Sequence, residues 1–177
     1  MKSDIIHIDN QGNGFEEALA ETVKVAEFIE LDNKEALQLR ICAEEMLGLA
    51  RSVTGELKAD FWMEVEGKTV NLHMSTKTVM DLEKRSLLIS SSSAHRNEAA
   101  TSFLGKLRDK FEEAMTAEAN YGDGEMQTNV SMDISFSHSD NGEWDGFERS
   151  ILRKLADNIK ISIRGGNVDM NVTKSFK

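Results

Sequence analysis

Proline is absent from the 177 residues, and cysteine occurs once, at Cys42. Without proline, no stretch has the stiff composition that marks many linkers between domains. A single cysteine excludes an intramolecular disulfide and a cluster of thiolate metal ligands. No run approaches the roughly 18 apolar residues of a membrane span, and the first ten residues lack an apolar signal-peptide core. We therefore expect a single cytoplasmic domain over residues 1–177, without a membrane partner.

Positive charge is also scarce, because 21 lysines and arginines stand against 31 aspartates and glutamates, for a net charge of −10. Nucleic-acid binding needs a concentrated positive surface, so the composition argues against a nucleic-acid partner. No phosphate loop of the Walker type and no nucleophile elbow is present. The histidines are scattered without metal-ligand spacing, and they are His7, His73, His95 and His138. We expect no metal site from them.

What the sequence does contain is helical periodicity, strongest in the stretch Leu37–Thr54. Asp32 and Asn33 precede it as candidates for the N-cap, and Gly55 follows as a stop. An acidic pair, Glu44 and Glu45, adjoins the apolar face of this helix, and each carboxylate needs either solvent or a partner. The apolar residues recur at three- and four-residue steps and are Leu39, Cys42, Ala43, Met46, Leu49, Ala50 and Val53.

The rest of the chain alternates between strand and helix patterns. The expected strands are Asp4–Asp9, Ala59–Val65, Thr69–Ser75, Met126–His138, Asn158–Arg164 and Asn167–Phe176, and the expected further helices are Phe15–Leu31, Val79–Ser90, Asn97–Thr116 and Asp145–Asp157. Glycine-bearing turns at Gly67 and at Gly165–Gly166 predict two β-hairpins. In the first helix we expect these residues to face inward: Phe15, Leu19, Val23, Ala26, Phe28 and Ile29. Together the elements predict an α/β two-layer sandwich, with helices packed on one face of a mixed β-sheet.

The central stretch CAEEMLGLARSVTG resembles the signature helix of the GHKL (histidine kinase-like) ATPases, and especially of the single-domain anti-sigma-factor serine kinases. In that family the helix carries the pattern E-x-x-x-N-A, whose glutamate positions the attacking group and whose asparagine binds the magnesium ion of ATP. Here Glu45 takes the glutamate position, and Leu49 takes the asparagine position. Leucine cannot bind magnesium, which requires oxygen ligands.

Two further nucleotide motifs of the family are incomplete. The adenine-binding loop, D-x-G-x-G in the family, aligns with MSTKTVMDLEKRS, where Asp81 comes several residues late. The segment DGFERSILRKLAD resembles the glycine-rich turn and helix that bind phosphate, with Gly146 as the remaining glycine and Glu148 adding a charge that repels phosphate. His95 and Arg96 lie where the family has its mobile lid and are candidates to face a phosphate, although an ordinary helix–loop–helix accounts for them as well.

Three incomplete motifs in one site indicate that selection for ATP has been relaxed. The leading hypothesis is a degenerate ATPase-fold protein without cofactor, which binds a protein partner or a second copy of itself as a regulatory module. The remnant pocket would comprise Glu44, Glu45, Asp81 and Gly146. The alternative is an ATP-dependent serine/threonine kinase with Glu45 as general base, in which Glu44, Glu45 and water hold magnesium. A third hypothesis is a sensor that binds ATP without hydrolysing it.

Overall fold

The computed structural model describes residues 1–9, 11–54, 58–100, 105–106, 109–110, 112–114 and 151–177. In chain order the elements are β1 (Ile6–Asp9), α1 (Phe15–Phe28), α2 (Asn33–Thr54), β2 (Lys58–Glu66), β3 (Thr69–Lys77), α3 (Leu82–Ser91), the 3₁₀ helix η1 (Glu98–Ala100), β4 (Asn158–Arg164) and β5 (Asn167–Ser175). The expected strand Met126–His138 lies outside the described residues. Residues 151–155 are helical, as expected for the end of the helix Asp145–Asp157. Within these ranges, no helix has the length and apolar character of a membrane-spanning segment.

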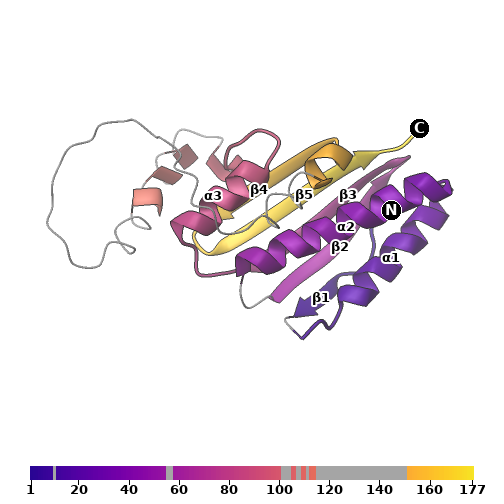
Figure 1. Cartoon of the computed structure of the whole chain (residues 1–177), viewed down its shortest axis with the longest axis horizontal. Helices are drawn as coiled ribbons and strands as arrows, with labels where there is room; N and C mark the ends of the chain where they lie inside the picture. The colour runs from indigo at the N-terminus through magenta and orange to yellow at the C-terminus, as the bar shows by residue number, and fades with distance from the viewer. Residues whose placement is uncertain (10, 55–57, 101–104, 107–108, 111, 115–150) are drawn as a thin grey trace, which may run out of the picture.

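The five strands form one sheet in the order β1-β2-β3-β5-β4 (Figure 1). All four pairings are antiparallel, so the expectation of a mixed sheet is wrong for the described strands. For two of the four pairings the reason is local: tight turns join β2 to β3 and β4 to β5, and a hairpin can connect only antiparallel strands. Gly67 and Gly165 open these turns with φ of +59°, a conformation that glycine adopts without strain.

The helices α1, α2 and α3 lie on one side of the sheet (Figure 1). Alternate strand residues point toward them and are buried, as Phe61 and Met63 of β2 are, with 0% exposure. The core therefore lies between the helices and the sheet, as expected for a two-layer sandwich. We call the opposite side of the sheet the polar face, and its main residues are Asp60, Trp62, Glu64, Asn71, His73, Ser75, Asp169, Asn171 and Thr173.

The central helix α2 confirms the prediction made from its periodicity. The predicted core residues that the structure describes are at most 5% exposed, namely Leu39, Cys42, Ala43, Met46, Leu49 and Ala50. At its N-terminus, the Glu35 amide donates to Asp32 Oδ1 at 2.7 Å, and the Asp32 amide donates to Glu35 Oε2 at 3.2 Å. This reciprocal pair is a capping box, which fixes the start of the helix.

The first helix differs from its prediction in both its end and its buried face. It ends at Phe28 rather than Leu31, and Val23 and Phe28 are 42% and 63% exposed, so the expectation that both face inward is wrong. Ala26 is buried as predicted, and three other predicted residues pack partly buried against the core, namely Phe15, Leu19 and Ile29. The face that packs on α2 and β1 also carries Ala18, Thr22 and Val25. Thr22 is tolerated there because its hydroxyl donates to Ala18 O at 2.8 Å, which satisfies the buried polar group.

Cys42 is fully buried in α2, and this burial raises the pKa of its thiol from 9.0 to about 12. Because the thiolate is the reactive form, we expect the native protein at pH 8 to react with an aromatic disulfide reagent on the order of a thousandfold more slowly than the protein in urea. Equal reaction rates for the native protein and the protein in urea would contradict this prediction.

The raised pKa of Cys42 also predicts that folding stability falls as the pH rises from 9.0 toward 12, because the unfolded chain loses the thiol proton first.

Candidate functional site

The glutamates expected in a remnant ATP site lie on one turn of α2 but in different environments. Glu44 points to the flank, where its Oε1 accepts a hydrogen bond from Arg40 Nε at 3.2 Å, and its side chain is 39% exposed. Glu45 is partly buried, and its Oε2 is shielded from solvent. Of the two, Glu45 is therefore the carboxylate whose environment resembles that of an active-site group, because such groups are commonly desolvated.

Leu49 occupies the position at which the family has its magnesium-binding asparagine. It is 5% exposed and belongs to the hydrophobic core. Its side chain offers no oxygen to a hard cation. Within the described residues, no group of three histidine, cysteine, aspartate or glutamate side chains is arranged to hold a metal ion. The residues present therefore do not fit a magnesium–ATP complex held in the manner of the family.

Asp81 lies at the start of α3, where it acts as the N-cap. Its Oδ1 accepts a hydrogen bond from the Lys84 amide at 2.8 Å, and the Lys84 ammonium lies 3.6 Å from Oδ2. A side-chain cap of this kind stabilises a helix by about 1 kcal/mol. It also explains why α3 begins at Leu82 rather than at Val79, which is 85% exposed. Gly146, the fourth residue of the predicted pocket, lies outside the described residues.

The basic pair that could face a phosphate is engaged with other side chains. Arg96 Nε donates to Glu98 Oε1 at 3.2 Å. His95 Nε2 lies 3.1 Å from a guanidinium nitrogen of Arg153, which belongs to the C-terminal helical segment. In the described part of the chain, the segment around His95 and Arg96 therefore contacts residues 151–155.

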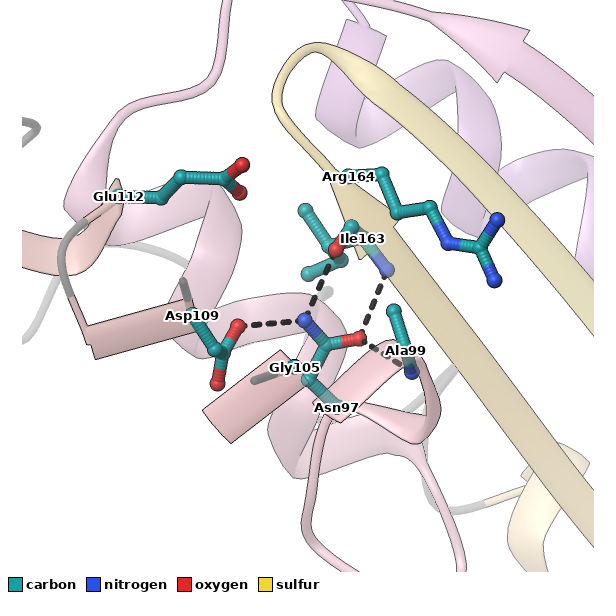
Figure 2. A pocket seen from close by; sticks show the side chains of 7 residues that line it. All are labelled: Asn97, Ala99, Gly105, Asp109, Glu112, Ile163 and Arg164. Atoms are coloured by element: carbon teal, nitrogen blue, oxygen red, sulfur yellow. Dashed lines mark hydrogen bonds between the residues drawn. The ribbon is translucent and has the colours of Figure 1, made fainter. Parts of the chain in front are cut away.

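At the outer edge of β4 lies a polar cluster that the sequence reasoning missed (Figure 2). The side chain of Asn97, 4% exposed, donates to Ile163 O at 2.9 Å and accepts from Ile163 N at 2.8 Å. Ser93 forms hydrogen bonds with both backbone groups of Ile159 in the same way. Its amide donates to Ile159 O at 2.9 Å, and its Oγ accepts from Ile159 N at 2.8 Å. These contacts take the place of a neighbouring strand and protect the sheet edge from pairing with another chain.

A buried ion pair supports this edge. Arg85 of α3 is 4% exposed and pairs with Asp109, which also accepts a hydrogen bond from Asn97 Nδ2 at 2.5 Å. Glu112 Oε2 accepts a hydrogen bond from Gly165 N at 3.0 Å. Asn97, Asp109 and Glu112 border a cavity of about 300 Å³ (Figure 2). Because the polar atoms of Asn97 bond to protein groups on every side, we interpret the cluster as a clamp between α3 and β4.

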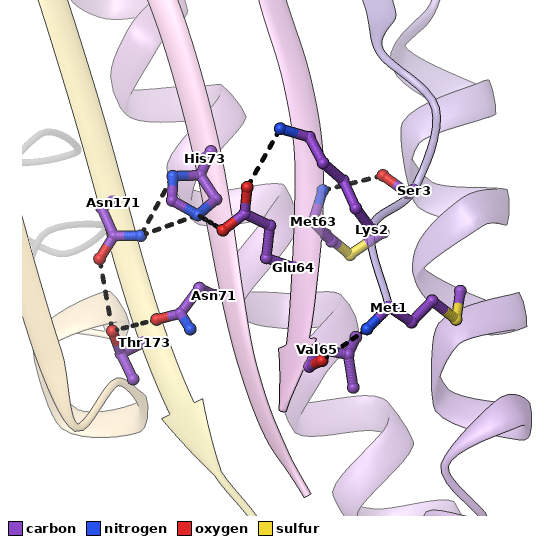
Figure 3. Close-up of polar contacts among 10 residues, drawn as sticks. All are labelled: Met1, Lys2, Ser3, Met63, Glu64, Val65, Asn71, His73, Asn171 and Thr173. Atoms are coloured by element: carbon purple, nitrogen blue, oxygen red, sulfur yellow. Dashed lines mark hydrogen bonds and ion pairs between the residues drawn. The ribbon is translucent and has the colours of Figure 1, made fainter. Parts of the chain in front are cut away.

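The polar face carries a hydrogen-bonded row centred on His73 (Figure 3). The imidazole stacks on Trp62 with ring centroids 5.0 Å apart, and Asn171 Nδ2 lies 3.3 Å from His73 Nδ1. Glu64 lies 3.6 Å from His73 Nε2 and 3.1 Å from Lys2 Nζ. The Lys2 ammonium lowers the pKa of Glu64, and burial lowers the pKa of His73. The imidazole is therefore neutral at pH 7, and the row ties the N-terminal segment to the sheet.

Two comparisons with known proteins were negative. No protein-family model matches the chain. No curated protein sequence matches it either. The resemblance to histidine kinase-like ATPases therefore rests on the central helix, the partial motifs and the order of the expected elements.

Proposed function

We propose that this protein is a degenerate histidine kinase-like ATPase-fold domain that does not hydrolyse ATP and that acts as a regulatory module by binding another protein. The observation that carries the proposal is the burial of Leu49, 5% exposed, at the position of the magnesium ligand. Magnesium neutralises the charge that develops during phosphoryl transfer, so a site that cannot hold it loses most of its catalytic power.

Two further residues of the expected site, Asp81 and Glu44, support the same conclusion, because their contacts serve the fold. Asp81 caps α3, and Glu44 pairs with Arg40 on the surface of α2. A partner protein would find apolar contacts near the α1–α2 turn, where Phe28 and Leu37 are 63% and 56% exposed. Aromatic side chains such as Phe28 are enriched in protein interfaces. A second copy of the chain is a further candidate for the partner, and light scattering of the purified protein tests it.

We expect millimolar Mg-ATP or Mg-ADP to leave the melting temperature unchanged, because the site lacks a magnesium ligand. A nucleotide that binds only the folded state would raise stability by about 2.7 kcal/mol at a hundredfold excess over Kd, which is several degrees. The measurement is thermal unfolding with and without nucleotide, with EDTA and Glu45→Ala as controls. A shift that disappears with either control would overturn the proposal.

That outcome would favour the second candidate, an ATP-dependent serine/threonine kinase with Glu45 as general base. One observation supports this candidate: Glu45 Oε2 is shielded from solvent, as the carboxylates of active sites commonly are. The candidate also needs magnesium to be held by Glu44, Glu45 and water. Glu44 instead pairs with Arg40 at 3.2 Å, which is why we rank the kinase second.

A further inference from the structure

Two lysines lie side by side at one end of the polar face. Strands β2 and β3 pair with Ala59 opposite Thr76, so the next position outward places Lys58 beside Lys77. Ala59 and Thr76 are buried on the helix side of the sheet. Because successive residues of a strand point to opposite faces, both lysines belong to the polar face. Like charges directly opposite each other on neighbouring strands destabilise a sheet.

In the part of the chain that the structure describes, no carboxylate forms an ion pair with either lysine. The register places Asp9 next to Lys58. The Asp9 carboxylate, however, is engaged in its own turn, where it accepts hydrogen bonds from Gln11 N at 2.8 Å, Asn13 N at 3.1 Å and Asn13 Nδ2 at 2.7 Å. Asn13 and, to a smaller extent, the Lys58 ammonium lower the pKa of Asp9, so Lys58 has this carboxylate nearby without forming an ion pair with it. Among the described residues, Lys77 forms no ion pair, in a chain whose net charge is −10.

The lysines border a surface hollow of about 500 Å³. This volume is typical of sites for small organic ligands and is much larger than a single inorganic anion. Asn167, beside Lys77 in the register, provides a neutral amide at the rim. On the other side the hollow is bordered by His7 and Asp60, which are 2.6 Å apart. The hollow therefore has two lysines at one end, beside the Asp9 carboxylate that is hydrogen-bonded within its own turn, and hydrogen-bonding groups around the rest of its rim.

We propose that this hollow binds a small phosphorylated polyol or sugar, with its phosphate between the ammonium groups of Lys58 and Lys77. A phosphate monoester is close to a dianion at neutral pH, so it matches two adjacent positive charges and removes their repulsion. The His7–Asp60 pair and Asn167 offer acceptors and a donor to the hydroxyl groups of the ligand. The site lies on the opposite side of the sheet from α2, so it stands independently of the proposed function.

The test is a titration of the ¹⁵N-labelled protein with ribose 5-phosphate at constant ionic strength, followed by the backbone amide signals of residues 58, 77 and 167. We expect saturable shifts with ribose 5-phosphate, at least threefold weaker binding of inorganic phosphate, and no shifts with ribose. The Lys58→Gln/Lys77→Gln variant should bind at least tenfold more weakly. Lys160 of β4 is exposed on the polar face of the same sheet, outside the hollow. Lys160→Gln is therefore the matched control, and this variant should bind ribose 5-phosphate as tightly as the unchanged protein does.

Three results would overturn this proposal. Shifts that do not saturate would mean that no site exists. Equal affinity in the double variant and in the unchanged protein would mean that the lysines do not hold the ligand. Equal affinity for inorganic phosphate and ribose 5-phosphate would mean that the hollow binds free phosphate and does not recognise the sugar. The amide spectrum of the double variant checks the fold, which exposed lysine-to-glutamine changes should leave intact.

Discussion

Replacing Arg85 with alanine is expected to lower the free energy of unfolding by about 3 kcal/mol, because the change leaves a largely buried carboxylate without its cation. Arg85 pairs with Asp109, and the two side chains are 5% and 21% exposed. Breaking a buried ion pair typically costs about 3–5 kcal/mol of stability, and we expect the lower value here because partial exposure lets water reach Asp109. The effect should extend to the β4 edge, because the same carboxylate accepts a hydrogen bond from Asn97. Urea unfolding followed by circular dichroism gives the measurement.

The matched control for this variant is Arg40→Ala. Arg40 pairs with Glu44 on the surface of α2, where the side chains are 50% and 39% exposed, so its loss should cost only about 0.3–0.5 kcal/mol. A double variant, Arg85→Met with Asp109→Leu, should recover much of the lost stability, because replacing both charges leaves neither one unpaired. If Arg85→Ala costs no more than Arg40→Ala, the buried pair does not hold α3 to the segment around Asp109.

The second large effect is expected for Gly14→Ala, at the N-cap of α1. Gly14 has φ of +78°, and a Cβ atom there would lie 2.1 Å from His7 O on β1. The obstacle is backbone, so the strand or the helix must move, and we expect a loss of about 2–4 kcal/mol from this contact together with left-handed strain. Differential scanning calorimetry should show the loss as a lower melting temperature.

Gly12→Ala separates the effect of the close contact with His7 O from the effect of left-handed backbone strain. Gly12 also has a positive φ, +86°, but a Cβ atom there would have nothing within 4 Å. It should therefore show only the strain of a left-handed alanine, about 1 kcal/mol. Equal losses at Gly12 and Gly14 would mean that the close approach of α1 to β1 is not what requires glycine at position 14.

The sequence by itself determined the elements whose information is local. The periodicity of α2 predicted its buried face, and alternation around a glycine turn predicted both hairpins. The burial of Cys42 followed from its place on that face. An aspartate directly before a helical pattern is a typical N-cap, so the local sequence also accounts for the cap that Asp81 forms on α3.

Only the tertiary structure decided how these elements meet. It placed β5 between β3 and β4, and it turned α1 so that Val23 faces outward. It also separated Glu44, on the flank of α2, from Glu45, beside the core. Local propensity has no preference among such arrangements, because they depend on how neighbouring elements bury their apolar surfaces together.

The side-chain clusters show the same limit most clearly. Asn97 and Ile163 are 66 positions apart in the chain, and the register of β2 and β3 places Lys58 and Lys77 on neighbouring strands. No spacing pattern marks either pair in the sequence, since each residue taken alone is an ordinary polar side chain. Their charges and hydrogen bonds act through space, over a few ångströms, and the fold alone determines which groups come within that distance.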